Sequence, residues 1–174
     1  MPPDRKTEEN IASGEYFPLT FSLYRATINA IFFTRKQQIP VFRSQQDQAG
    51  FDMDFRAMAE AVQPEVVAFR RDLHEHPEAS FQEFRTTEQI AKEMDKLGIP
   101  YRRFEPTGLI AEIKGGKPGK TIALRADIDA LSITEKTGLP FASKNDGFMH
   151  ACGHDTHAAM LVGAAKVLMQ VKDQ

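Results

Sequence analysis

The fold is decided by one mostly apolar run, Thr121-Ile122-Ala123-Leu124-Arg125-Ala126-Asp127-Ile128. A run of this kind predicts a β-strand buried on both faces, as in sheets that helices cover on either side. The glycine- and proline-containing segment 115–119 precedes it and predicts a turn. We therefore expect this strand to lie inside an α/β sheet.

Two further strands are expected upstream of that turn. Residues 108–114 alternate in part between apolar and polar side chains. Residues 100–104 are short and polar, which favours a strand at the edge of the sheet.

Helical patterns flank these strands. Apolar residues recur at near-helical spacing over 55–76, and Pro64 is expected in the first turn of the main helix there. Ser80 and Glu83 have the spacing of a capping box, which predicts that a second helix starts there. This helix is expected to end at Gly98.

The last helix is expected over about 155–170, which is rich in alanine, leucine, valine and methionine. The order of helix, helix, three strands, loop and helix indicates an α/β/α sandwich around a mixed sheet. Three strands are few for such a domain, so we expect an incomplete one.

Residues 1–52 lack a clear helical or strand period and are interpreted as a poorly ordered extension. Their one apolar stretch, 17–33, is interrupted by Arg25 and Asn29 and is too short and polar for a membrane span. A membrane anchor is the weaker alternative. Because helical patterning begins abruptly after Met53, we expect Met53 to be the natural start of a domain over 53–174.

Composition excludes several classes of partner. The chain has 174 residues, 41% of them hydrophobic and 26% charged, which is typical of one soluble globular domain. A net charge of −2 offers no electrostatic surface for nucleic acid, and no membrane partner is expected. The single cysteine excludes an internal disulfide and fits a reducing compartment, so a cytoplasmic location is expected.

Candidate metal donors are concentrated in Met149-His150-Ala151-Cys152-Gly153-His154-Asp155-Thr156-His157. Cys152 and His154 carry a sulfur and a nitrogen donor of the kind that zinc prefers, and Gly153 between them lets the backbone bend. The alternative is that the cysteine is a small buried hydrophobe and the histidines only cap or pack. His150 and His157 are expected to support the site by hydrogen bonding and packing.

A carboxylate at the end of the apolar strand is a further candidate. Ligands of open α/β sheets gather at the carboxyl ends of strands, where Asp127 lies. It could bind a metal, orient a metal-bound histidine, or form a salt bridge with Arg125. Asp129 has a weaker case.

The sequence His74-Glu75-His76 does not fit a metalloprotease helix, because zinc-binding histidines on one helical face are four residues apart. Both are interpreted as residues at a helix C-terminus, where the helix dipole favours them.

Four ordered motifs together resemble a known family. They are Arg70-Arg71-Asp72-Leu73-His74-Glu75-His76-Pro77-Glu78, Ser80-Phe81-Gln82-Glu83, Leu124-Arg125-Ala126-Asp127-Ile128-Asp129-Ala130-Leu131 and Met149-His150-Ala151-Cys152-Gly153-His154-Asp155. The chain from Met53 to Gln174 is similar to the metal-dependent amidohydrolases and metallopeptidases that include hippurate hydrolases, N-acyl-amino-acid amidohydrolases, related carboxypeptidases and auxin-conjugate hydrolases.

The resemblance implies a zinc-peptidase-like fold with two divalent ions, drawn from zinc, manganese, cobalt or nickel. It makes Cys152 and His154 metal ligands, supported by His150, Asp155 and His157. Arg125 stands where the wider family has a histidine, so Asp127 would be an orienting acid. His74 and Glu78 would belong to the structural signature rather than to catalysis.

The resemblance also implies that the general-base glutamate, the remaining ligands and the lid domain follow the residues present here. The full-length parent would be a homodimer or homotetramer hydrolysing the amide bond of an N-acyl amino acid or short peptide. The present chain is expected to be inactive, because two donors do not hold a catalytic metal. The alternatives are a non-enzymatic interaction module and a redox-sensing cysteine protein.

Overall fold

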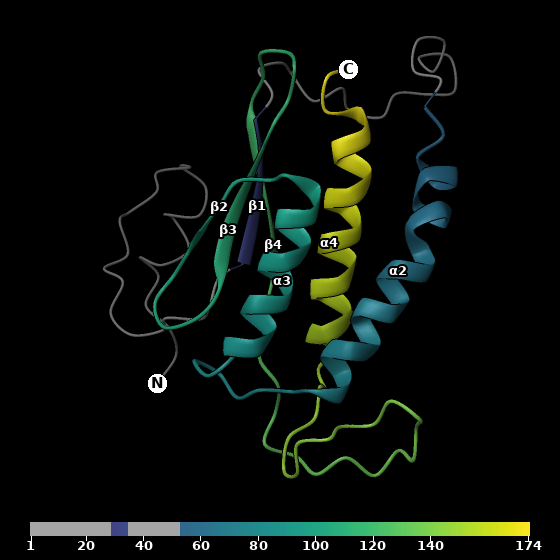
Figure 1. Cartoon of the computed structure of the whole chain (residues 1–174), viewed down its shortest axis with the longest axis vertical. Helices are drawn as coiled ribbons and strands as arrows, with labels where there is room; N and C mark the ends of the chain where they lie inside the picture. Colours follow the sequence, from purple (N-terminus) through teal and green to yellow (C-terminus); the bar gives the residue numbers. More distant parts are fainter. Residues whose placement is uncertain (1–28, 35–52) are drawn as a thin grey trace, which may run out of the picture.

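A computed structural model describes residues 29–34, as backbone, and residues 53–174. Figure 1 shows the order of its elements along the chain. They are β1 (Asn29–Thr34), α2 (Phe55–Glu75), α3 (Phe84–Leu97), β2 (Tyr101–Arg103), β3 (Leu109–Lys114), β4 (Thr121–Ala126) and α4 (His154–Val171). No helix in these described residues is long and apolar enough to span a bilayer.

The strands form one mixed sheet in the order β2-β3-β1-β4. β1 runs parallel to β3 and antiparallel to β4, whereas β2 and β3 are antiparallel. The predicted mixed α/β architecture and the edge position of β2 are therefore confirmed. β1 adds a strand inside 1–52, where none was expected, and the rest of that segment lies outside the described residues. The predicted domain start at Met53 stays a prediction.

β4 is the predicted apolar strand, but its predicted burial on both faces is wrong. Every residue of β4 except Ala126 is exposed, including Ile122 and Leu124 at 43% and 39%. The reason is its place in the sheet: β4 is an edge strand, and no other strand of the described residues pairs with its outer side.

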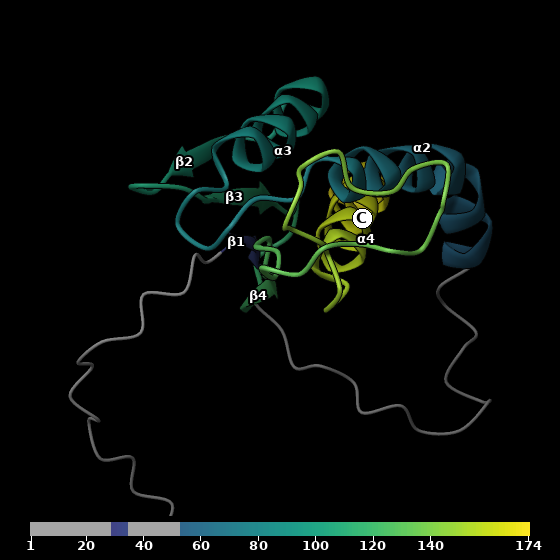
Figure 2. The same ribbon diagram turned by 90° about the horizontal axis from the view of Figure 1, so that it is seen from below.

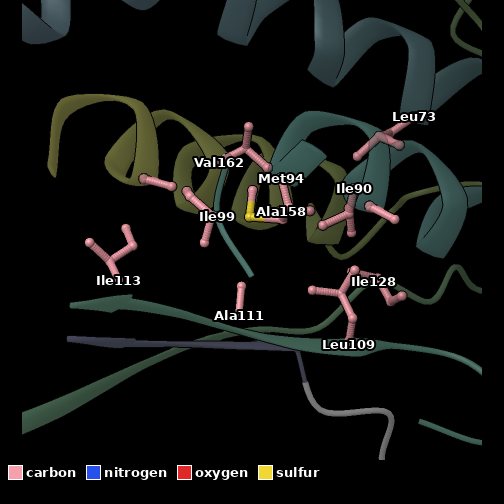
Figure 3. Close-up of a cluster of buried hydrophobic side chains, with 12 residues drawn as sticks. Leu73, Ile90, Met94, Ile99, Leu109, Ala111, Ile113, Ile128, Ala158 and Val162 are labelled. Carbon is pink, nitrogen blue, oxygen red and sulfur yellow. The ribbon is translucent and has the colours of Figure 1, made fainter. Parts of the chain in front are cut away.

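The described helices lie over one face of the sheet. α3 and α4 pack on the strands, and α2 packs along α4 (Figure 2). The side chains of Leu109, Ala111 and Ile113 alternate along β3 and rise toward the helices, where Met94 and Val162 meet them (Figure 3). This apolar layer, to which α4 contributes Ala158, Val162 and Ala165, is the core of the described chain.

The longest helix, α2, begins before its predicted start. Asp54 is its N-cap and accepts a hydrogen bond from the backbone N–H of Ala57 at 2.9 Å. Pro64 lies inside the helix rather than in its first turn. Because Pro64 is exposed, water can hydrate the carbonyl that its missing N–H leaves unpaired.

The predicted capping box at the start of α3 is also wrong, although the helix itself and its end at Gly98 are confirmed. The helix begins at Phe84, and its N-cap Glu83 makes no capping hydrogen bond through its side chain. Instead, the two carboxylate oxygens of Glu78 accept from the backbone N–H groups of Arg85 and Thr86 at 2.9 and 2.7 Å. A charge from an earlier turn therefore neutralises this helix start.

Replacing Glu78 with alanine is expected to lower the free energy of unfolding by about 1 to 2 kcal/mol, because two helix N–H groups lose their acceptor. The matched control is Ser80→Ala, which removes an exposed hydroxyl and should change stability by less than about 0.5 kcal/mol. Urea denaturation followed by circular dichroism measures both. A larger loss of stability for Ser80→Ala than for Glu78→Ala would support the predicted capping box instead.

Candidate metal-binding site

The two predicted donors lie on either side of the glycine that starts α4. Gly153 is the N-cap of this helix and has a φ of 78°, a conformation that residues with a side chain rarely adopt. Cys152 precedes it as an exposed free thiol, and His154 is the first helical residue. The predicted bend between Cys152 and His154 is thus present, and it depends on glycine.

His154 is oriented by a carboxylate on the segment that follows β4. Its Nδ1 lies 2.9 Å from Asp129 Oδ1 and 3.0 Å from the carbonyl oxygen of Asp129. With Nδ1 engaged in this way, Nε2 is the nitrogen that remains to bind a ligand. A metal-binding histidine in proteins is held by the same kind of contact through its other nitrogen.

The carboxylate that contacts His154 in the structure is therefore that of Asp129, whereas the strand-end argument favoured Asp127, whose orienting role stays a prediction. Asp127 forms an ion pair with Arg125, whose Nη2 lies 2.7 Å away, and both side chains are more than a third exposed. Of the contacts considered for Asp127, the salt bridge with Arg125 is the one present in the structure. Sequence alone offered no signal to separate these two aspartates, because both stand next to the apolar Ile128.

His150 is buried without any hydrogen-bond partner in the part of the chain that the structure describes. Its exposure is 4%, and both ring nitrogens are unpaired there. Burial lowers the pKa of His150 to about 4; the charge of Asp155 opposes this shift, while His74 and His154 add to it. His150 is therefore packed in the interior, but the described residues give it no hydrogen bond, and its supporting role stays a prediction. His157 is exposed, with its ring centroid 5.8 Å from that of His154.

Asp155, the second residue of α4, is fully buried and paired with two residues of α2. Its Oδ2 lies 2.8 Å from His74 Nδ1 and 2.7 Å from Arg70 Nε. His74 is 3% exposed, so it is not the surface residue at a helix C-terminus that the dipole argument describes. Its Nε2 faces Glu135 Oε1 at 3.3 Å. A sequence reading could not pair His74 with Asp155, because nothing local connects them.

Glu135 has a side chain that is only 3% exposed and is surrounded by donors. Burial alone would raise its pKa, but hydrogen bonds from Thr137, the Ser143 backbone and His74 outweigh burial and lower it. Glu135 therefore stays ionised as a fixed point of the loop between β4 and α4.

The donor chemistry fits a divalent metal, but the number of donors does not complete a site. A thiol and an imidazole with its Nδ1 held are the ligands that zinc and similar ions prefer. Within residues 53–174, however, no three histidine, cysteine, aspartate or glutamate side chains are grouped so that they could hold an ion. The assignment of Cys152 and His154 as ligands stays a prediction.

Comparison with known proteins supports a hydrolase family for this arrangement. The sequence model of peptidase family M20/M25/M40 matches residues 123–174. The N-acetylcysteine deacetylase of Bacillus subtilis is 53% identical over 115 residues, which cover 63% of this chain and 30% of that protein. Thermostable carboxypeptidase 1 of Saccharolobus solfataricus is 49% identical over 110 residues, which cover 62% and 28%. The N-acyl-L-amino acid amidohydrolase of Geobacillus stearothermophilus is 44% identical over 121 residues, which cover 69% and 33%.

Two solved structures resemble the chain in three dimensions. A Bacillus subtilis protein, described as a dinuclear metal binding peptidase of the M20 family, has a TM-score of 0.55 and 46% identity. The match covers 64% of this chain and 32% of the Bacillus subtilis protein. A putative aminohydrolase from methicillin-resistant Staphylococcus aureus has a TM-score of 0.62 and 39% identity. The match covers 69% of this chain and 33% of the aminohydrolase.

The chain spans about a third of the length of these relatives, with coverage of 28 to 33%. The three relatives named are a carboxypeptidase, a deacetylase and an amidohydrolase. Over the part that these comparisons cover, the chain matches the M20 family of peptidases and amidohydrolases.

Proposed function

We propose that this chain carries part of the active site of a metal-dependent hydrolase that cleaves the amide bond of N-acyl amino acids or short peptides. The observation that carries the proposal is the pairing of His154 Nδ1 with Asp129, next to the free thiol of Cys152. Together they present one imidazole nitrogen and one sulfur at a helix start, with the imidazole already oriented. The substrate class is taken from the relatives, which are described as deacetylases, amidohydrolases and carboxypeptidases.

The proposed cofactor is a pair of divalent ions, such as zinc, manganese, cobalt or nickel. This chain would contribute Cys152 and His154 as ligands. When bound, such ions supply a more acidic water and polarise the scissile carbonyl. The role of this chain's residues is to hold and orient: Asp129 fixes the ring of His154, and Gly153 fixes its spacing from Cys152. Hippurate-like substrates, a cytoplasmic location and a homo-oligomeric parent belong to the same proposal.

The 174-residue chain alone is proposed to bind metal weakly and to hydrolyse nothing. A catalytic ion needs about three protein donors and a water, and the described residues bring together fewer. Metal-dependent turnover of hippurate by a chain of verified length would overturn this part of the proposal.

Metal binding tests the donor assignment directly. Titration of the full chain with Co²⁺ is expected to produce a thiolate-to-cobalt absorption band. Cys152→Ser should abolish the band, and His154→Ala should weaken binding by more than about tenfold, since even outer-sphere partners are worth about 10- to 100-fold. His76→Ala is the matched control, because His76 bonds to the Asp72 carbonyl at the end of α2 and should leave binding unchanged. An equal band in Cys152→Ser would refute the assignment.

The rival proposal, a non-enzymatic interaction module, has one observation in its favour, which is the exposed apolar edge strand β4. It makes a different prediction. Titration with metal would then give no thiolate band, while substitution of Ile122 by a charged residue would leave folding unchanged and alter self-association measured by sedimentation.

A further inference from the structure

We propose that His74, acting through Asp155, is a positioning residue that holds the two metal donors at the start of α4. This inference rests on the proposed function, because it concerns the geometry of Cys152 and His154. His74 itself contacts Arg70, Asp155 and Glu135 rather than either donor, so its effect must pass through the residues that it binds.

The first link joins two helix ends. α2 and α4 run side by side in opposite directions, so the end of α2 lies beside the start of α4 (Figure 1). There His74 Nδ1 meets Asp155 Oδ2 at 2.8 Å, and both side chains are buried. Asp155 directly follows His154, so a fixed Asp155 side chain fixes the backbone from which the His154 ring projects.

The second link joins the same histidine to the loop that leads to Cys152. His74 Nε2 lies 3.3 Å from Glu135 Oε1, and the other oxygen of Glu135 accepts from the Ser143 backbone at 2.6 Å. The base of this loop is closed by two backbone hydrogen bonds between Leu131 and Met149, each 3.0 Å long. Cys152 follows that closure by three residues, so the contacts of His74 constrain both donors.

Further contacts attach the loop to the same end of α2. The backbone N–H of Lys144 donates to the Glu75 carbonyl at 2.8 Å, and the Asn145 side chain donates to the Pro77 carbonyl at 2.9 Å. These contacts join the loop to the end of α2 only, whereas His74 binds both α4 and the loop. Among residues 53–174, removing His74 would leave Asp155 with Arg70 as its remaining side-chain partner.

The alternative to positioning is that His74 only fills space in the core. The two roles differ in how they depend on the substituted side chain. Asparagine can place an N–H near the position of Nδ1 and keep the bond to Asp155, whereas glutamine places it near the position of Nε2 and loses that bond. A residue that only fills space would tolerate the larger glutamine at least as well.

The test is the Co²⁺ affinity of the full chain, read from the thiolate-to-cobalt band, for His74→Asn, His74→Gln and His74→Ala. Positioning predicts affinity within about threefold of the parent for asparagine, and losses of about tenfold or more for glutamine and alanine. The band should also shift in those two variants, because the cobalt geometry changes, and a stability loss alone would not cause this. If His74→Ala does not fold, the asparagine–glutamine comparison decides.

The matched control is Lys166→Met. Lys166 is another ion-pair residue of α4; its side chain is mostly covered, and its Nζ lies 2.5 Å from Glu65 of α2 and 2.9 Å from Glu93 of α3. It lies about 18 Å along the helix from His154, at about 1.5 Å per residue. Its loss should lower stability but leave cobalt affinity unchanged.

The outcomes separate the two levels of the proposal. If the parent chain binds Co²⁺ through Cys152 and the three His74 variants bind it equally well, the positioning role is overturned and the metal site stands. If the parent chain itself gives no thiolate band, the proposed function fails, and the inference that rests on it fails with it.

Discussion

Replacing Asp155 with alanine is expected to lower the free energy of unfolding by about 3 to 5 kcal/mol. Asp155 is fully buried, and its Oδ2 pairs with both Arg70 Nε and His74 Nδ1. Without this carboxylate, a buried imidazole and a mostly buried guanidinium lose their shared anionic partner, and little water can replace it. Urea denaturation at neutral pH measures the change.

The matched control is the same substitution at Asp127, which also pairs with an arginine. Asp127 and Arg125 are 39% and 50% exposed, so Asp127→Ala should cost less than about 1 kcal/mol. Similar losses at the two positions would mean that the buried network contributes no more than a surface ion pair. They would also remove the link between α2 and α4 that the positioning role of His74 requires.

The parts of the fold that sequence predicted are those that local chemistry determines. Gly98 ends α3 because its φ of 65° suits a residue without a side chain. The turn at 115–119, the strand before it and the glycine between Cys152 and His154 follow from the same kind of local preference. These features need no knowledge of distant residues, so a single sequence was enough.

Two of the failures depend on how segments fold against one another rather than on a local pattern. The cap of α3 comes from Glu78 rather than from Ser80, because a carboxylate from the preceding turn reaches both N–H groups. β4 has an apolar sequence but lies at a sheet edge, and edge position is a property of the assembled sheet. Composition could not have revealed either arrangement.

The candidate site divides in the same way. Cys152 and His154 were found from their residue types and spacing, and their ligand role stays a prediction. Asp129 was only a weaker candidate, and Glu135 and the pairing of His74 with Asp155 were missed, because these contacts depend on how the segment between β4 and α4 folds. Sequence thus identifies candidate donors, whereas the residues that orient them become visible only in three dimensions.

The second large expected effect is a loss of stability in mild acid caused by His150. Its pKa is lowered to about 4 in the folded chain, mainly because burial disfavours the charged ring. An unfolded histidine titrates near pH 6.5, so protons bind the unfolded chain more readily. The stability that His150 contributes is therefore fully present above about pH 6.5 and is lost as the pH falls toward about 4.

The size of this effect follows from the two pKa values. Between pH 8 and pH 5, linkage predicts a loss of about 2 kcal/mol from His150 alone. Glu93 and Glu135 have lowered pKa values, so their contribution is present above their unfolded pKa of about 4.5 and is lost only below it. The window from pH 8 to pH 5 therefore separates the histidine from these carboxylates.

The control is His150→Leu, which keeps an apolar group of similar size and removes the titration. At pH 8 this variant should be about as stable as the parent, because neither ring nitrogen has a hydrogen-bond partner to lose among the described residues. At pH 5 it should be more stable than the parent by about 2 kcal/mol, since other titrating groups affect both chains equally. Parallel losses in the two chains, measured by urea denaturation at both pH values, would show that another group carries the acid sensitivity. The buried imidazole next to the candidate donors would then have no role in setting the pH at which this part of the chain is folded.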